Sequence, residues 1–175
     1  MMYPLFIVPL FHHEVSDWAN KKQRFLSLLD DKNFYELPNA SFVSDRNNHN
    51  YTKEFIDIFY DEIVSFLKET DLQEMKHIDV WTVKYTDNGD SHFPHNHGST
   101  GFSGVLYLEY DPEVHQSTKF VSSWNNPVTD MTQLSSIPDA RSGVMYFWPS
   151  YLLHYTDPLK TNKPRTIVSW DMKVQ

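Results

Sequence analysis

The sequence of 175 residues contains no cysteine. This absence excludes disulfide-stabilised folds, thiolate metal sites and cysteine nucleophiles. Basic residues are also few: 15 Lys and Arg stand against 23 Asp and Glu, which gives a formal net charge of −8. A nucleic-acid partner is therefore not expected, because the neutralisation of phosphates needs clustered Lys and Arg.

Long apolar stretches are missing as well. No segment approaches the roughly 18 apolar residues of a membrane span, so no membrane partner is expected. The opening MMYPLFIVPLF is apolar but short, lacks a cationic start and contains two prolines. It predicts a first strand or extended segment and not a signal peptide. No repeat or Gly/Ser linker divides the chain, which predicts one domain over residues 1–175. We expect this domain in the cytoplasm.

The apolar pattern changes along the chain. Residues from Ser16, a candidate N-cap, to about Asp30 and from Thr52 to about Glu69 have the periodicity of two helices. After residue 77, runs rich in β-branched and aromatic residues predict strands, separated by turn formers. These runs are 78–86, 102–110, 118–123, 143–149 and 165–172. We expect a mainly β sandwich or barrel buttressed by two N-terminal helices, with an irregular loop over 124–142.

Histidine is abundant, with nine copies. His95 and His97 stand two apart, so an extended strand would project both imidazoles to one face. His154 follows the run 143–149 and is a candidate third ligand. Three imidazoles would leave about half of an octahedral ion's positions open, as suits iron(II). His92 stays undecided, and surface or capping roles are expected for His12, His13, His49, His77 and His115.

Arg165 lies 165 − 154 = 11 residues after His154 and opens the last predicted strand. If that strand runs antiparallel to the one ending near His154, the arginine would point into the same cavity. A buried guanidinium without an acidic neighbour needs an anionic partner, and a ligand carboxylate held bidentately would supply it.

The string YTDNGDSHFPHNHGSTGFSGVLYL, followed by GVMYFWPSYLLHYTDP and RTIVSW, resembles the 2-oxoglutarate-dependent iron(II) oxygenases. It looks closest to their small prolyl-hydroxylase-like group of bacteria and tailed phages, and the likeness spans nearly the whole chain. The resemblance implies a double-stranded β-helix, a jelly-roll barrel. It also implies iron(II) at His95, His97 and His154, and 2-oxoglutarate at Arg165 and Tyr107. Tyr85, ten residues before His95, matches a tyrosine that lines that pocket in some relatives.

The implied activity is hydroxylation of an unidentified substrate by O₂, with release of succinate and CO₂. The substrate could be a prolyl or other protein residue or a small molecule. Tyr151 and Tyr155 flank His154 and could touch the substrate. The setting would be the host cytoplasm if the chain is phage-encoded. One departure stands out: His97 occupies the place of the family's usual carboxylate ligand, so either His97 binds the metal or water fills its place. Asp90 is too far from His95 along the chain to supply the carboxylate ligand in place of His97.

Two alternatives stay open. The spacing of the histidines also resembles the metal motifs of cupins. The glutamate that cupins place four or five residues after the second histidine is absent, since Gly101 and Phe102 stand there, and a cupin has no reason for an arginine at position 165. The chain could also be a catalytically inactive barrel that serves as a binding or structural module.

Overall fold

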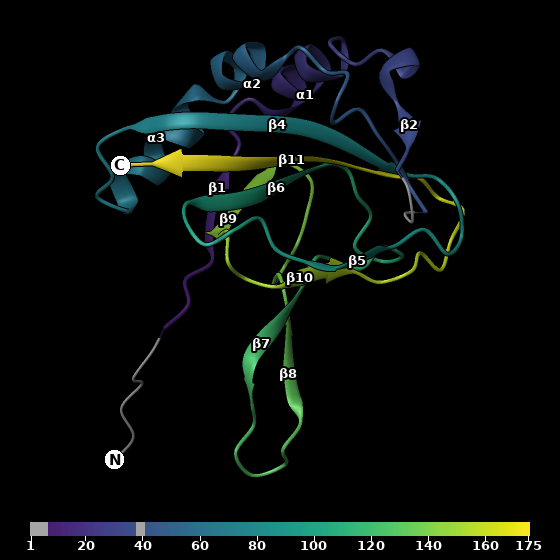
Figure 1. Ribbon diagram of the computed structural model, residues 1–175. Helices are drawn as coiled ribbons and strands as arrows, with labels where there is room; N and C mark the ends of the chain where they lie inside the picture. Colours follow the sequence, from purple (N-terminus) through teal and green to yellow (C-terminus); the bar gives the residue numbers. More distant parts are fainter. Residues whose placement is uncertain (1–6, 38–40) are drawn as a thin grey trace.

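Two antiparallel sheets face each other in the computed structural model, which describes residues 7–37 and 41–175 (Figure 1). The larger sheet has seven strands in the order β1-β9-β6-β11-β4-β3-β2, and the smaller one has four in the order β5-β10-β7-β8. The predicted mainly β jelly-roll architecture is confirmed. The strands of the larger sheet, in that order, are Phe11–Glu14, Val144–Pro149, Phe102–Glu109, Arg165–Val174, Met75–Tyr85, Val43–Ser44 and Tyr35–Glu36. Those of the smaller sheet are His92–His95, His154–Thr156, Lys119–Asn125 and Thr132–Ser136.

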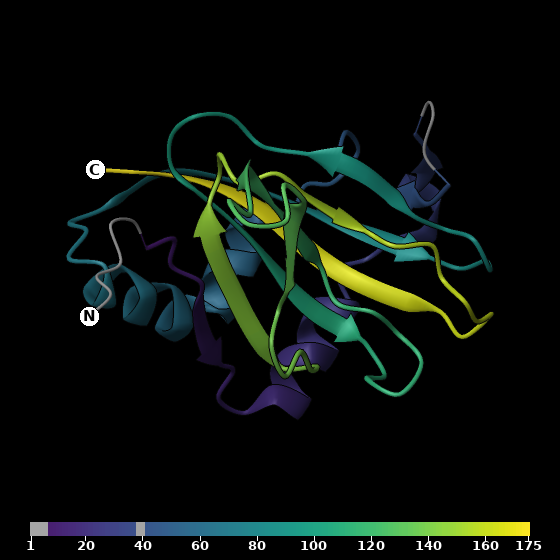
Figure 2. The same ribbon diagram turned by 90° about the horizontal axis from the view of Figure 1, so that it is seen from below.

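The larger sheet is buried on both faces because its strands alternate between two cores. On β11, Val168 and Trp170 pack against the helices, while Ile167 points into the space between the sheets. Figure 2 shows the helices behind the long strands of this sheet, with the β7–β8 hairpin in front. Gly104 on β6 lets Trp170 lie flat against the sheet, since a Cβ there would stand 2.3 Å from the indole ring.

The helical segments are shorter and more numerous than the sequence predicts. Helix α1 covers Trp18–Leu26, and the expected helix 52–69 is two helices, α2 (Thr52–Ile58) and α3 (Tyr60–Glu69), which break at Phe59. Ser16 does not cap α1. Its N–H and hydroxyl donate instead to the Glu62 carboxylate, at 2.9 and 3.0 Å, and Glu62 also pairs with Lys21 at 2.8 Å. The prediction of a Ser16 cap is thus wrong because a buried carboxylate competes for the hydroxyl.

Two expectations about strands need correction. The segment 124–142 is not a wholly irregular loop, because β8 pairs with β7 in a hairpin that projects below the barrel (Figure 1). Strand β11 is not antiparallel to β9: both pair antiparallel with β6, so they run parallel, one strand apart. The predicted strand over 1–11 falls partly on residues 1–6, which lie outside the described residues, and β1 begins at Phe11.

Candidate metal centre

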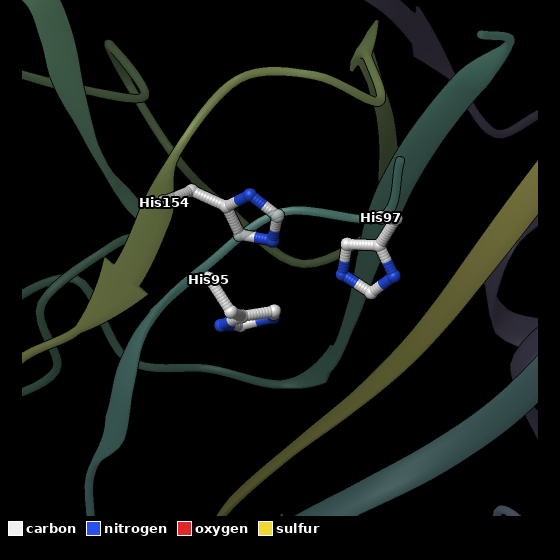
Figure 3. Close-up of side chains that lie close together, drawn as sticks. All are labelled: His95, His97 and His154. Carbon is white, nitrogen blue, oxygen red and sulfur yellow. The ribbon is translucent and has the colours of Figure 1, made fainter. Parts of the chain in front are cut away.

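Three histidines converge beside the paired strands β5 and β10 of the smaller sheet (Figure 3). His95 ends β5, His97 lies two residues beyond it, and His154 begins β10, directly opposite His95 in the β5–β10 pair. One ring nitrogen of each lies within 4.8 Å of the others. The proline of β5 fits there because β5 is an edge strand, where a missing N–H costs no ladder hydrogen bond. Neighbouring strand ends thus bring distant histidines together.

The hydrogen bonds of the three rings favour one tautomer. Nδ1 of His95 lies 2.7 Å from the carbonyl of Phe93, and Nδ1 of His154 lies 2.9 Å from that of Leu152. Nδ1 of His97 lies 2.8 Å from Oδ2 of Asp171. Each partner is an acceptor, so each Nδ1 must carry the proton, which leaves the Nε2 lone pair of every ring free for a metal. The donor set therefore fits a divalent metal with three nitrogen ligands.

Burial favours the neutral form of two of the rings, those of His95 and His154, as metal binding requires. Burial, together with the smaller effect of the neighbouring His95, lowers the pKa of His154 to about 3. Burial likewise lowers the pKa of His95. Aromatic side chains form the surrounding wall: Trp148 lies edge-on to His154, with ring centroids 5.1 Å apart, and Trp81 stacks on His97 at 5.7 Å.

His92 is a fourth histidine beside the three. Its ring stacks on His95 with the centroids 3.9 Å apart, and it also packs on Phe42, with the centroids 4.7 Å apart. Burial, together with the smaller effect of the adjacent His95, lowers its pKa to about 3. His92 does not belong to the set of three converging nitrogens, and it packs against one of the candidate ligands.

Arg165 lies at the start of β11 with only 1% of its surface exposed. Its guanidinium stacks over Tyr85, its partner in the β4–β11 register, at 4.1 Å from the ring centroid. Nη1 donates to the carbonyl of Gln116 at 2.7 Å, while the buried Nε has no hydrogen-bond partner. Within the described residues no carboxylate forms an ion pair with Arg165. A buried cation without a counterion is costly, and an anion bound here would offset that cost.

Tyr107 and Tyr85 stand beside that guanidinium on the two strands that flank β11. Tyr107 is fully buried, which raises the pKa of its hydroxyl, and the hydroxyl oxygen accepts the Thr118 N–H at 2.9 Å. One cavity connects this region with the histidines, since its lining includes Tyr85, Thr118 and Tyr155 as well as all three rings. Tyr151 lies elsewhere: it is 48% exposed and lines a separate groove along the β7–β8 hairpin.

The sequence reasoning missed Asp171, which holds His97. Burial raises the pKa of this carboxyl, but the hydrogen bond from His97 and then those of its other partners outweigh that effect and leave the pKa below its ordinary value. A signal was present: Asp171 stands 171 − 165 = 6 residues after Arg165, and an even spacing on a strand puts both on the same face.

The histidines expected to have surface or capping roles lie away from the cavity. His115 is buried, accepts the Asp111 N–H through Nδ1 and lies 3.0 Å from the Lys163 carbonyl through Nε2. It thereby ties down the turn that leads into β11. Asp90 accepts the N–H groups of Thr86 and Asp87 and shapes another turn.

Comparison with known families decides what this constellation is. The family model described as "Putative 2OG-Fe(II) oxygenase" matches residues 79–171, more than half of the chain and the stretch that contains the three histidines, Arg165 and Asp171. The chain belongs to this family. It is therefore a 2-oxoglutarate- and iron(II)-dependent oxygenase with O₂ as cosubstrate, and the cupin alternative is not favoured. No curated protein sequence matches the chain.

Solved structures share the fold of this oxygenase at low sequence identity. A Pseudomonas putida prolyl-4-hydroxylase has a TM-score of 0.64 and 10% identity, with 96% of this chain and 94% of that chain covered. A Trichoplax adhaerens prolyl hydroxylase bound to a peptide of hypoxia inducible factor has a TM-score of 0.62, 10% identity and coverage of 94% and 83%. HygX of Streptomyces hygroscopicus, with nickel, 2-oxoglutarate and hygromycin B bound, has a TM-score of 0.66, 12% identity and coverage of 95% and 83%. Among the described residues, no helix of the oxygenase is long and apolar enough to cross a membrane.

Proposed function

We propose that this oxygenase hydroxylates a prolyl or other residue of a peptide or protein, and that 2-oxoglutarate is converted to succinate and CO₂ in the same reaction. The observation that carries the proposal is the buried Arg165, a cation without a counterion that adjoins the cavity of His95, His97 and His154. A dicarboxylate satisfies both ends of such a cavity, because one carboxylate can bind a metal while the other pairs with the guanidinium.

The residues of the chain have separate roles in this proposal. His95, His97 and His154 hold iron(II) through Nε2, and Arg165 with Tyr107 receives the far carboxylate of 2-oxoglutarate. The ring of Tyr85 stacks against the guanidinium. When bound, iron(II) supplies the activation of O₂ that lets one oxygen atom enter a substrate C–H bond while the other enters succinate. The aromatic walls around the cavity exclude water and thereby protect the reacting groups.

An apolar groove beside the metal cavity supports a peptide substrate. Trp148 lines both the groove and the cavity, so the two adjoin at its indole ring. Among the described residues, no charged side chain lines the groove, which suits an uncharged segment with apolar side chains and does not suit a small anionic metabolite. The lining comes from the segment before β1, both strands of the hairpin and the turn after β9, and includes Leu10, Phe120, Trp124, Leu134, Pro138 and Tyr151.

The edge of the smaller sheet supports the same substrate class. Strand β8 is the last strand of that sheet and all five of its residues are exposed. Its outer N–H and C=O groups can pair with an extended chain, which is a common mode of peptide recognition. A peptide bound along β8 would lie over the groove with alternate side chains directed into it.

Anaerobic reconstitution with iron(II) and 2-oxoglutarate tests the cofactor roles. We expect a visible metal-to-ligand absorption band that is lost in His154→Ala and weakened in Arg165→Ala. The matched controls are His77→Ala and Arg24→Ala, both at exposed positions outside the site. After O₂ is admitted, succinate should form in the wild type. Metal binding without any band or succinate would favour the inactive barrel.

The substrate class is tested with a synthetic uncharged prolyl peptide, capped at both ends, against free L-proline. We expect the peptide to accelerate 2-oxoglutarate consumption and to gain one oxygen atom by mass spectrometry. Acceleration by the free amino acid, with no response to the peptide, would contradict the assignment of the groove.

A further inference from the structure

The three candidate ligands are held in two different ways. His95 and His154 each bond through Nδ1 to a carbonyl two residues earlier in the chain, so their own backbone orients them. His97 has no such local partner. Its Nδ1 bonds to the carboxylate of Asp171, 74 residues away on β11 in the larger sheet. The histidine that replaces the family's usual carboxylate ligand is thus the one that contacts a carboxylate.

Asp171 is itself held firmly. Oδ2 accepts from Nδ1 of His97 at 2.8 Å, and Oδ1 accepts from the hydroxyl of Ser103 on the neighbouring strand β6, also at 2.8 Å. Ser103 is hydrogen bonded in turn to Ser150 at 2.9 Å. Nη2 of Arg46 lies 3.6 Å from Oδ2 and partly compensates the charge. Partners on both oxygens fix the direction in which the carboxylate faces His97.

The opposite side of His97 is also fixed. Trp81 stacks on the imidazole at an interplanar angle of 25°, and the Arg46 guanidinium stacks on Trp81 at 4.1 Å from its ring. Asp45, the residue before Arg46 in the chain, is buried and accepts the Tyr51 hydroxyl and the Thr82 N–H, each at 2.7 Å. Packing and hydrogen bonding therefore leave the His97 ring one orientation, with Nε2 toward the other two histidines.

We propose that Asp171 is a positioning residue that holds His97 as the Nδ1–H tautomer and makes Nε2 a stronger, more carboxylate-like ligand. This inference rests on the proposed metal-binding role of the three histidines. A carboxylate bonded to a ligating imidazole fixes its tautomer and raises its basicity. The oxygenase thus keeps a carboxylate at the site, but the imidazole ring of His97 lies between this carboxylate and the position of the metal.

The test compares metal binding in Asp171→Asn and in Asp79→Asn. Asp79 is a matched control because it faces Asp171 across the β4–β11 pair and lies 3.5 Å from a different histidine, His49. Affinities for zinc(II) and cobalt(II) are measured by competition with a chelator, and the cobalt(II) absorption spectrum reports ligand geometry. We expect Asp171→Asn to weaken binding by about 10- to 100-fold and to change the spectrum. The control should match the wild type, and equal affinities and spectra in all three proteins would overturn the proposal.

A second pair of variants, made in the His97→Asp background, separates an effect on the metal ligand from an effect on packing. In His97→Asp the carboxylate returns to the coordinating position, so Asp171→Asn in that background should leave metal affinity unchanged or increase it by relieving repulsion. A loss of the same size in both backgrounds would show a merely structural role and contradict the inference.

A measurement on the unmutated protein tests the proposal even if the variants fail to fold. In zinc-loaded wild type, ring ¹⁵N NMR should show the proton of His97 on Nδ1, strongly deshielded by its carboxylate partner. A proton on Nε2 would refute the proposal. Metal affinity and tautomer are read without turnover, so absence of succinate with these results intact would count against the proposed hydroxylase activity alone.

Discussion

The two sheets of the barrel differ in how much of each strand they bury. Every residue of β9 is buried, and so are six of the eight residues of β6. In the smaller sheet, all five residues of β8 are exposed and β7 becomes exposed toward its end. Helices cover the outer face of the larger sheet, whereas in the described part of the chain the outer edge of β8 is uncovered. One sheet is a packed platform and the other is partly an open surface.

The functional groups divide in the same way. Arg165, Tyr107 and Asp171, which need fixed positions, lie on the larger sheet, where neighbours on both faces restrict their rotamers. The smaller sheet supplies His95 and His154 and the exposed groove. Hence substitutions in the larger sheet should act first on stability, and substitutions in the hairpin should act on substrate binding with little effect on folding.

The largest effect is expected for Gly104→Ala in the larger sheet. Its Cβ would lie 2.3 Å from the Trp170 ring and 2.4 Å from the Tyr146 carbonyl, and neither a buried indole nor a backbone oxygen can yield easily. We expect the free energy of unfolding to fall by about 3 kcal/mol in urea titrations. Ser135→Ala on β8 is the control and should change it by less than about 0.5 kcal/mol. Equal losses would remove the distinction between the sheets.

Acid should destabilise the metal-free protein through the smaller sheet. His92 and His154 have a pKa of about 3 in the fold, against the ordinary value of 6.5. Between these values the unfolded chain binds more protons, so stability falls as the pH falls from about 6.5 toward 3. Each histidine contributes at most about 1.4 kcal/mol per pH unit. Urea titrations at several pH values from 7 to 5 give the free energy of unfolding as a function of pH. This free energy should fall less steeply with falling pH in His92→Gln than in the exposed control His77→Gln, and identical pH dependences would contradict this assignment.

Replacing the buried cation of the larger sheet should raise stability while it removes function. In the part of the chain that the structure describes, Arg165 has no counterion and its Nε has no partner, so Arg165→Met should raise the free energy of unfolding of the ligand-free protein by about 1 kcal/mol. The same variant should bind 2-oxoglutarate too weakly for calorimetric detection when loaded with zinc(II). A less stable variant would show that the arginine serves the fold, and a variant that still binds 2-oxoglutarate would contradict the proposed role of the guanidinium in binding it.

Strand positions and three ligand candidates could be predicted from the sequence because both depend on local patterns. The β-rich runs after residue 77 became strands within a few residues of the predicted ends, and the two-residue spacing of His95 and His97 indicated a shared face. The helix break at Phe59 and the loss of the Ser16 cap could not be predicted, since both depend on tertiary packing, in the case of Ser16 against Glu62. Asp171 was missed for a similar reason: its partner is 74 residues away. Strand β8 was missed because its exposed residues carry no apolar alternation.

The smallest effect on folding is expected in the β7–β8 hairpin. Leu134 on β8 is 58% exposed and lines the apolar groove, so Leu134→Ser removes little buried surface and should change the free energy of unfolding by less than about 0.5 kcal/mol. The same substitution removes an apolar contact from the proposed peptide site and should raise the KM for a capped prolyl peptide severalfold. Turnover of 2-oxoglutarate without peptide should be unchanged, because the metal cavity does not include Leu134. A loss of stability comparable to that of Gly104→Ala would mean that the hairpin belongs to the packed platform, and an unchanged KM would move the substrate to another face of the barrel.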